Sequence, residues 1–132
     1  MNNISFVQEF SIPTDQDNYS AIIPAVHSKA ELCDEYNKQL KFPYFGFNWD
    51  ALWDLLCDFH WIPQRHIHIY HESVASLPVD DLKVFIRIIT DACKDWENCQ
   101  SDSQPEKVLH FYFDSGEQGY VQEICHQILL VE

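Results

Sequence analysis

The stretch that decides the fold is FPYFGFNWDALWDLLCD, residues 42–58. Pro43 and Gly46 are typical of a helix end. Asn48 is a favourable N-cap for a second helix. After it, apolar residues recur at helical spacing, at Trp49, Leu52, Leu56 and Phe59. The segment therefore predicts a loop followed by a short amphipathic helix that has one face in the core.

The same helix carries aspartates four residues apart, at Asp50, Asp54 and Asp58. Like charges at this spacing repel by roughly 0.2–0.5 kcal/mol per pair, and the helix dipole favours an anion only near Asp50. Residues 42–64 contain no Lys or Arg, whereas an ordinary solvated helix face mixes both signs. With Trp53 beside it, the stripe indicates a protein-binding surface. A plain solvated face and a carboxylate acid–base pair are the alternatives.

Composition narrows the class of partner. The chain of 132 residues has 21 acids and 8 bases, a formal net charge of −13. Nucleic acids and anionic membrane surfaces are polyanions, so neither is expected to bind directly, whereas a basic protein is favoured. No apolar run is long enough for a membrane span, and the N-terminus does not resemble a signal peptide.

Several absences count against an enzyme. The chain has three glycines and no phosphate-binding glycine motif or nucleophile motif. Its five cysteines, at 33, 57, 93, 99 and 125, form no CxxC pair and no evident nucleophile–base arrangement. They indicate reduced, mostly buried thiols in a cytoplasmic protein. We therefore expect neither catalysis nor a cofactor.

Hydrophobic periodicity predicts an α/β domain. The first strand lies within residues 5–10 or 20–23. A helix capped by Ser28 runs to about Leu40. After the decisive segment come a strand over residues 65–71, a helix from an Asp80 N-cap to about Trp96, a polar loop over residues 98–106 and a buried strand over 108–113. A final helix is marked by Val121, Ile124, Cys125, Ile128 and Leu129. Strands that alternate with helices indicate a parallel or mixed sheet.

The histidines on the middle strand raise a metal hypothesis. His66 and His68 share one face of the strand and could supply two ligands, whereas His71 points to the other side. No Cys or carboxylate is evidently placed to complete the set. A polar strand face, or histidines packed under a helix, is the commoner arrangement, so a histidine-based metal-binding domain is kept only as an alternative.

The run FPYFGFNWDALWDLL, residues 42–56, resembles the signature segment of the barstar family, a Y-[YF]-G-x-N-x-D-A-L-W-D run that joins two helices. The order of elements fits over about residues 20–114. The resemblance implies one α/β domain over residues 1–132, with a small three-stranded parallel sheet packed with helices. Residues 1–19 would be an N-terminal extension and residues 115–132 an extra C-terminal helix.

The resemblance also implies a function, which is to block the active site of a basic ribonuclease toxin. The chain would be a cytoplasmic immunity protein, monomeric when free. Asp54 would enter the phosphate site of the nuclease, and Asp50 would pair with a further basic residue. Asp91, in the long helix that ends near Trp96, would fall about where the family has a contacting glutamate. The partner-binding residues implied by position are Tyr44, Gly46, Asn48, Asp50, Trp53, Asp54 and Asp91. An acidic interaction module without a nuclease target is the alternative.

One position within the resemblance stays open. The family has an aromatic residue after the motif helix, and either Phe59 or Trp61 could fill that place, because residues 59–65 carry an apparent insertion.

Overall fold

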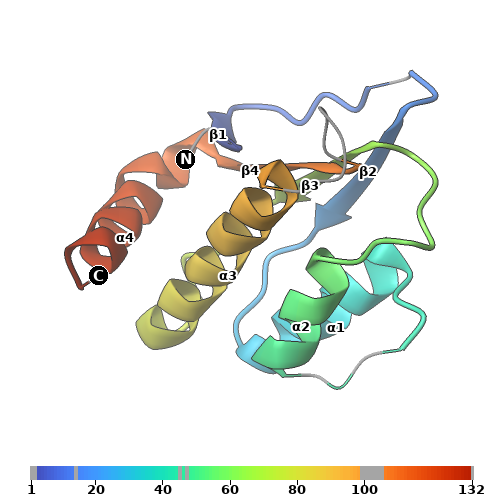
Figure 1. Ribbon diagram of the computed structural model, residues 1–132. Coiled ribbons are helices and arrows are strands. Elements are labelled where there is room, and N and C mark those ends of the chain that lie inside the picture. Colours follow the sequence, from blue (N-terminus) through green and yellow to red (C-terminus); the bar gives the residue numbers. More distant parts are fainter. Residues whose placement is uncertain (1–2, 14, 45, 47, 99–105, 132) are drawn as a thin grey trace.

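The computed structural model describes residues 3–13, 15–44, 46, 48–98 and 106–131. Within these residues the chain is an α/β fold with one parallel sheet and four α-helices (Figure 1). The elements are β1 (Ile4–Val7), β2 (Asn18–Ile23), α1 (Lys29–Leu40), α2 (Trp49–Leu56), β3 (His66–His71), α3 (Val79–Glu97), β4 (Val108–Asp114), a 3-10 turn η1 (Ser115–Glu117) and α4 (Gln118–Val131).

The sheet has four strands, in the order β1-β4-β3-β2, and every neighbouring pair is parallel. The prediction of three strands was therefore wrong. Both candidate segments for the first strand form strands, at opposite edges of the sheet. β1 was hard to predict because its four residues form a strand only against β4, with Ile4 opposite Phe111 and Val7 opposite Asp114.

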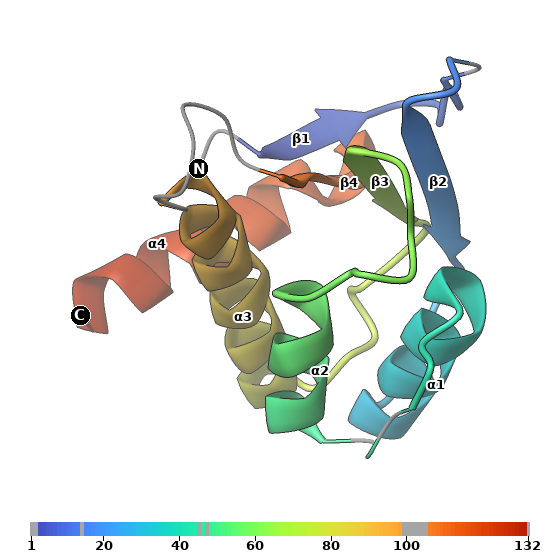
Figure 2. The same cartoon turned by 45° about the vertical axis from the view of Figure 1, so that its right-hand side comes forward.

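All four α-helices lie on one side of the sheet, and residues 8–13 and 15–17 cross the other side between β1 and β2 (Figures 1 and 2). Contacts hold this crossing segment to the sheet: the ring of Phe10 lies 4.8 Å from that of Tyr70, and the Tyr70 hydroxyl donates to the main-chain oxygen of Ser11 over 2.8 Å. The helical side contains the main core, and the crossing segment partly covers the second face.

Residues 108–113 were expected to form a strand buried on both faces. In β4, Leu109, Phe111 and Phe113 are buried, but the alternate residues are only partly buried. β4 is therefore fully packed only on its helical side, whereas β3 also buries His68 and Tyr70 on the opposite face.

The helix starts differ in how well the sequence predicts them. The Ser28 side chain accepts from the Glu31 N–H over 3.1 Å, so the predicted cap of α1 is confirmed. The predicted Asp80 cap of α3 is wrong, because α3 begins at Val79 after Pro78 and has no side-chain cap. Asp80 lies instead in the first turn, where the helix dipole favours a carboxylate.

The cysteines behave as small apolar residues. Cys33, Cys93 and Cys125 are buried free thiols, and Cys57 is partly buried. Cys99 lies outside the described residues, as does most of the predicted polar loop at 98–106. In the described part of the chain, no helix has the length and apolar character that crossing a membrane requires.

Candidate functional site

The helix α2 is held firmly at its start. The Asn48 side-chain oxygen accepts from the Ala51 N–H over 2.8 Å, which confirms the predicted N-cap. The Asn48 side-chain nitrogen also donates to the Gly46 main-chain oxygen over 3.1 Å. Asn48 therefore satisfies one of the free N–H groups in the first turn of α2 and also connects the start of the helix to Gly46.

One face of α2 is completely buried. Leu52, Leu55 and Leu56 have no exposed surface, and fully burying a leucine contributes roughly 1.5–3 kcal/mol. Phe59, which was expected to extend this stripe, follows the helix end at a left-handed φ of 48° and is also fully buried. The Phe59 ring therefore packs in the core, as predicted, but Phe59 lies in the turn after α2 and not in the helix.

The opposite face of α2 carries the charged residues. Asp50 and Asp54 are exposed, whereas Trp53 is partly buried and packs against the core. Trp49, expected to be a core residue, is also only partly buried. The Lys29 ammonium lies 5.2 Å from the centre of its ring, a distance suited to a cation–π contact.

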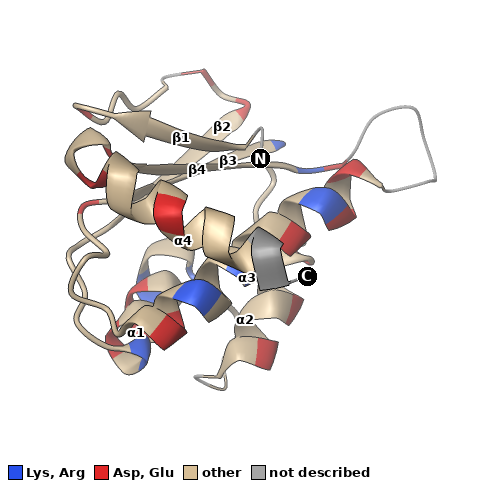
Figure 3. Cartoon of the chain, turned by 90° about the vertical axis from the view of Figure 1, so that its left-hand side faces the viewer, with Lys and Arg blue, Asp and Glu red and all other residues tan. Residues whose placement is uncertain are grey.

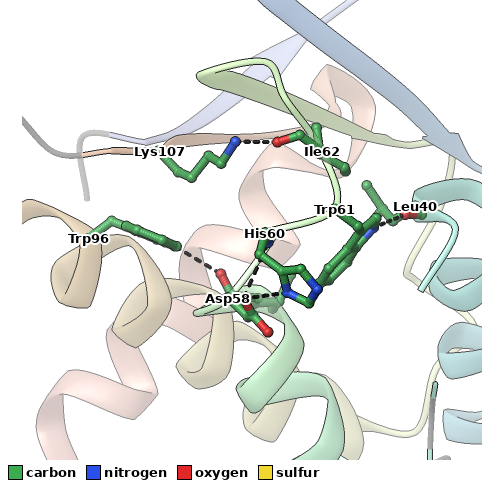
Figure 4. A network of polar contacts seen from close by, with 8 residues as sticks. Leu40, Asp58, His60, Trp61, Ile62, Trp96 and Lys107 are labelled. Atoms are coloured by element: carbon green, nitrogen blue, oxygen red, sulfur yellow. Dashed lines mark hydrogen bonds and ion pairs between the residues drawn. The ribbon is translucent and has the colours of Figure 1, made fainter. Parts of the chain in front are cut away.

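Asp58 does not continue the aspartate stripe. The helix ends at Leu56, so Asp58 lies in the turn that follows it. Its Oδ1 atom accepts from the His60 N–H over 3.2 Å and lies 2.9 Å from the His60 Nδ1 atom (Figure 4). The predicted stripe of three is therefore a pair, Asp50 and Asp54, and Asp58 shapes the local turn.

Three hydrogen bonds fix the chain that leaves α2 (Figure 4). The Trp96 indole donates to the Leu56 main-chain oxygen over 2.9 Å, and the Trp61 indole donates to the Leu40 main-chain oxygen, also over 2.9 Å. The Lys107 ammonium donates to the main-chain oxygen of Ile62. α2 is thus connected to α1, α3 and β4 through its C-terminal loop.

Burial distinguishes the two candidates, Phe59 and Trp61, for the aromatic residue that follows α2. Phe59 is fully buried, whereas Trp61 is partly exposed. Of the two, only Trp61 has surface that a partner could contact without unfolding of the core.

Helices α2, α3 and α4 together line a groove of about 590 Å³. It contains three of the predicted partner-binding residues, Asp50, Trp53 and Asp91. The remaining four do not line it. Tyr44 is 63% exposed, and Gly46 is also exposed, in the loop before α2; Asn48 caps the helix, and Asp54 lies one turn beyond Asp50.

The carboxylates of α2 and α3 gather around Cys57, at the end of α2. Burial, together with the nearby charges of Asp95, Asp54 and Asp91, raises the pKa of the Cys57 thiol to about 12. Asp54 and Asp91 thus act on the same atom although they come from different helices. Sequence motifs did not indicate Asp95, although its spacing could have done so: it follows Asp91 by four residues and so lies on the same side of α3.

The surface around α2 is not of one sign. In Figure 3, α2 carries acidic residues only, whereas α3 carries both signs. Lys83 and Arg87 of α3 line the same groove as Asp50, and Lys29 of α1 covers Trp49. The single-sign pattern therefore holds along α2 but not across the groove, because neighbouring helices supply cations that are distant in the sequence.

The histidines of β3 take part in a polar strand face. The His68 Nδ1 atom lies 2.8 Å from the Tyr112 hydroxyl, and its Nε2 atom lies 2.6 Å from the Asn18 side-chain oxygen. The His66 Nδ1 atom lies 3.0 Å from the His110 Nε2 atom. Both His68 nitrogens are thus engaged within the protein, and the described residues contain no group of three or more His, Cys, Asp or Glu placed to hold a metal ion.

On the other side of β3, His71 is buried and neutral. Its Nδ1–H donates to the Tyr112 main-chain oxygen over 2.9 Å, which leaves its Nε2 atom to accept from the Tyr36 hydroxyl over 2.7 Å. Burial lowers the pKa of His71 to about 4. The ring therefore acts as a polar member of the core, between β3 and α1.

Comparison with known proteins identifies one family. The family model described as barstar (barnase inhibitor) matches residues 20–112, more than two thirds of the chain. The matched range includes α1, α2, α3 and the loops that anchor α2, but neither β1 nor α4. No curated protein and no solved structure matched the chain.

Proposed function

The chain belongs to the barstar family, and from that membership we propose that it inhibits a ribonuclease by inserting the exposed face of α2 into the enzyme's basic active site. Members of this family are inhibitors and not enzymes, so the proposed activity is tight binding. The family description names barnase as the inhibited protein; the proposed target here is a basic ribonuclease toxin.

The observation that carries the proposal is the contrast between the two faces of α2. Three leucines are fully buried on one face, while Asp50 and Asp54 are exposed on the other. A ribonuclease site gathers cationic side chains that bind phosphate and stabilise the transition state. Carboxylates on a rigid helix can take the place of that phosphate, because charge-assisted hydrogen bonds to Arg and Lys are short and strong.

Each predicted residue then has a role. Asp54 enters the phosphate site, Asp50 pairs with a second basic residue of the enzyme, and Asp91 adds a contact from α3. Trp53 contributes apolar contact area between the carboxylates. In the preceding loop, Tyr44 and Gly46 form the edge of the binding surface. Asn48 keeps the start of α2 in place.

The net charge of −13 supports fast association with such an enzyme. Attraction between an acidic inhibitor and a basic site steers the encounter and raises the association rate. In this proposal the protein is a cytoplasmic immunity partner that binds the toxin as a free monomer and protects cellular RNA.

The test is inhibition of RNA cleavage by a panel of basic ribonucleases, including the product of the adjacent gene. Wild-type protein is expected to bind one enzyme with one-to-one stoichiometry and to stop cleavage. Asp54→Ala should weaken binding at least a hundredfold, since loss of a central charge at such an interface removes several kcal/mol. Asp34→Ala is the matched control, because Asp34 is a partly exposed acid of α1 that pairs with Lys38.

An acidic interaction module without a nuclease target gives a different result. It would leave every ribonuclease active, and Asp54→Ala and Asp34→Ala would behave alike toward any protein that binds. Either finding would contradict the proposed inhibition.

A further inference from the structure

We propose that the groove between α2, α3 and α4 receives an apolar side chain from a basic segment of the same ribonuclease, so that α4 forms part of the inhibitory surface. This inference rests on the proposed function and names the chemistry of a second contact. It concerns residues beyond those that the family resemblance implies, because α4 begins after the last matched residue, 112.

The floor of the groove is apolar. Val84 and Ile88 of α3 line it, together with Trp53 of α2 and Ile128 of α4. Val84 is 38% exposed, although it is an aliphatic residue within a helix. The volume of about 590 Å³ lies in the range of pockets that hold a compact apolar group. Such a floor is suited to an anchor residue, which is the usual centre of a binding hot spot.

The charged residues that line the groove indicate which kind of enzyme segment bears the apolar side chain. Asp50 and Asp91 line the groove from α2 and α3, and both belong to the proposed inhibitory face. A Lys or Arg next to the anchor would meet one of these carboxylates. Asp80, Lys83 and Arg87 also line the groove, and the two cations restrict where a cation of the enzyme can sit.

A second copy of the chain is a poor occupant. Each copy carries a net charge of −13, so two copies repel each other. A two-fold dimer would also place this groove, with its carboxylates, against itself. A basic enzyme already bound at Asp54 has neither difficulty, because the groove is continuous with the face that it contacts.

The α4 wall is supported from within the helix. The Gln127 side chain lines the groove and donates to the Glu123 carboxylate one turn earlier, over 3.3 Å. Ile128 is 9% exposed and belongs to the core. The wall is thus an ordered part of the folded domain, so α4 can present a fixed surface to the enzyme.

The test uses the ribonuclease that the wild-type protein inhibits. Val84→Trp fills the groove and should weaken binding at least tenfold, whereas Gln122→Trp places the same ring at an exposed position of α4 outside the groove and should leave binding unchanged. Val84→Lys should weaken binding more than Val84→Glu does, because both variants place a charge against the apolar anchor but only lysine also repels the basic segment. Equal thermal stability of the variants shows that they are folded.

The outcomes separate this inference from the proposed function. If Asp54→Ala abolishes binding while Val84→Trp and Val84→Lys bind like wild type, the groove is not a contact and the inference is overturned alone. If no ribonuclease binds the wild-type protein, both proposals fall. If sedimentation shows a wild-type dimer that Val84→Trp dissociates, the occupant is a second copy and the inference is wrong.

Discussion

The indole of Trp96, in the last turns of α3, donates to the main-chain oxygen of Leu56, the final residue of α2, over 2.9 Å. The bond ties the C-terminal end of the proposed inhibitory helix to the longest helix of the domain. Asn48 holds the other end. The exposed aspartates between these two points therefore lie on a short helix that is fixed at both ends, which lowers the entropy lost on binding.

Trp96→Phe should lower the free energy of unfolding by roughly 1–3 kcal/mol, because it leaves the buried Leu56 oxygen without its donor. Urea denaturation followed by circular dichroism measures the change. Trp61→Phe is the control, since it removes a bond of the same length to Leu40 at a partly exposed site. If both variants lose the same free energy of unfolding, the bond from Trp96 to Leu56 stabilises the protein no more than the bond from Trp61 to Leu40.

Asn48→Ala should destabilise the protein by about 1 kcal/mol, the usual loss when a helix N-cap is removed. Asn48→Ser should restore most of this stability, because serine also caps. Thermal unfolding measures both. If Asn48→Ala unfolds at the same temperature as the wild type, the hydrogen bond from the Ala51 N–H to Asn48 contributes nothing to stability.

The stability of the protein should depend on His71 below neutral pH. Its pKa is about 4 in the folded protein and about 6.5 in the unfolded chain. Between these values the unfolded chain binds the proton and the folded protein does not, so stability falls as the pH is lowered. The slope from one such group reaches up to about 1.4 kcal/mol per pH unit.

This dependence can be isolated by comparing wild type with His71→Phe in urea at a series of pH values from 7 to 4. The variant should be less stable at pH 7, where it loses the bonds to Tyr36 and Tyr112, but its stability should change less with pH. Burial and the nearby His68 and His66 also lower the pKa of His110 to about 4, so some dependence of the same sign should persist. Identical profiles would contradict a neutral, buried His71.

Association with the target ribonuclease should slow as salt is added. The Debye length falls from about 10 Å at 0.1 M to 3 Å at 1 M ionic strength, which screens the steering charge. Stopped-flow fluorescence from Trp53 and Trp49 measures the association rate. Asp54→Asn should flatten this salt dependence more than Asp34→Asn does. A rate that does not change with salt would argue against electrostatic steering.

The elements that sequence patterns predicted well are those whose signal is local. The caps at Ser28 and Asn48 depend on residues three positions away, and the apolar stripes of α2 and α3 depend on helical spacing. The start of α3 was predicted wrongly, and the reason is also local. Asp80 matched the N-cap preference, but Pro78 already fixed a backbone angle from which the helix could begin.

What the sequence could not provide were relationships between distant segments. The additional strand, β1, forms only by pairing with β4. The hydrogen bond from Trp61 needs the end of α1, and the cations around Trp49 come from α1 and α3. Asp58 was read by its spacing alone, because nothing in a one-dimensional pattern shows that the helix stops before it and that His60 folds back. The groove wall at Ile128 likewise exists only after α4 has packed on α3.

The placement of β1 has a consequence for folding during synthesis. Its hydrogen-bonding partner, β4, follows it by about a hundred residues, so a nascent chain on the ribosome carries β1 as an unpaired strand until that later segment has been made. Non-local strand pairing of this kind is slow, and unpaired strand edges promote aggregation of unfinished chains. The short length of β1, four residues, limits that hazard, and its pairing closes the edge of β4.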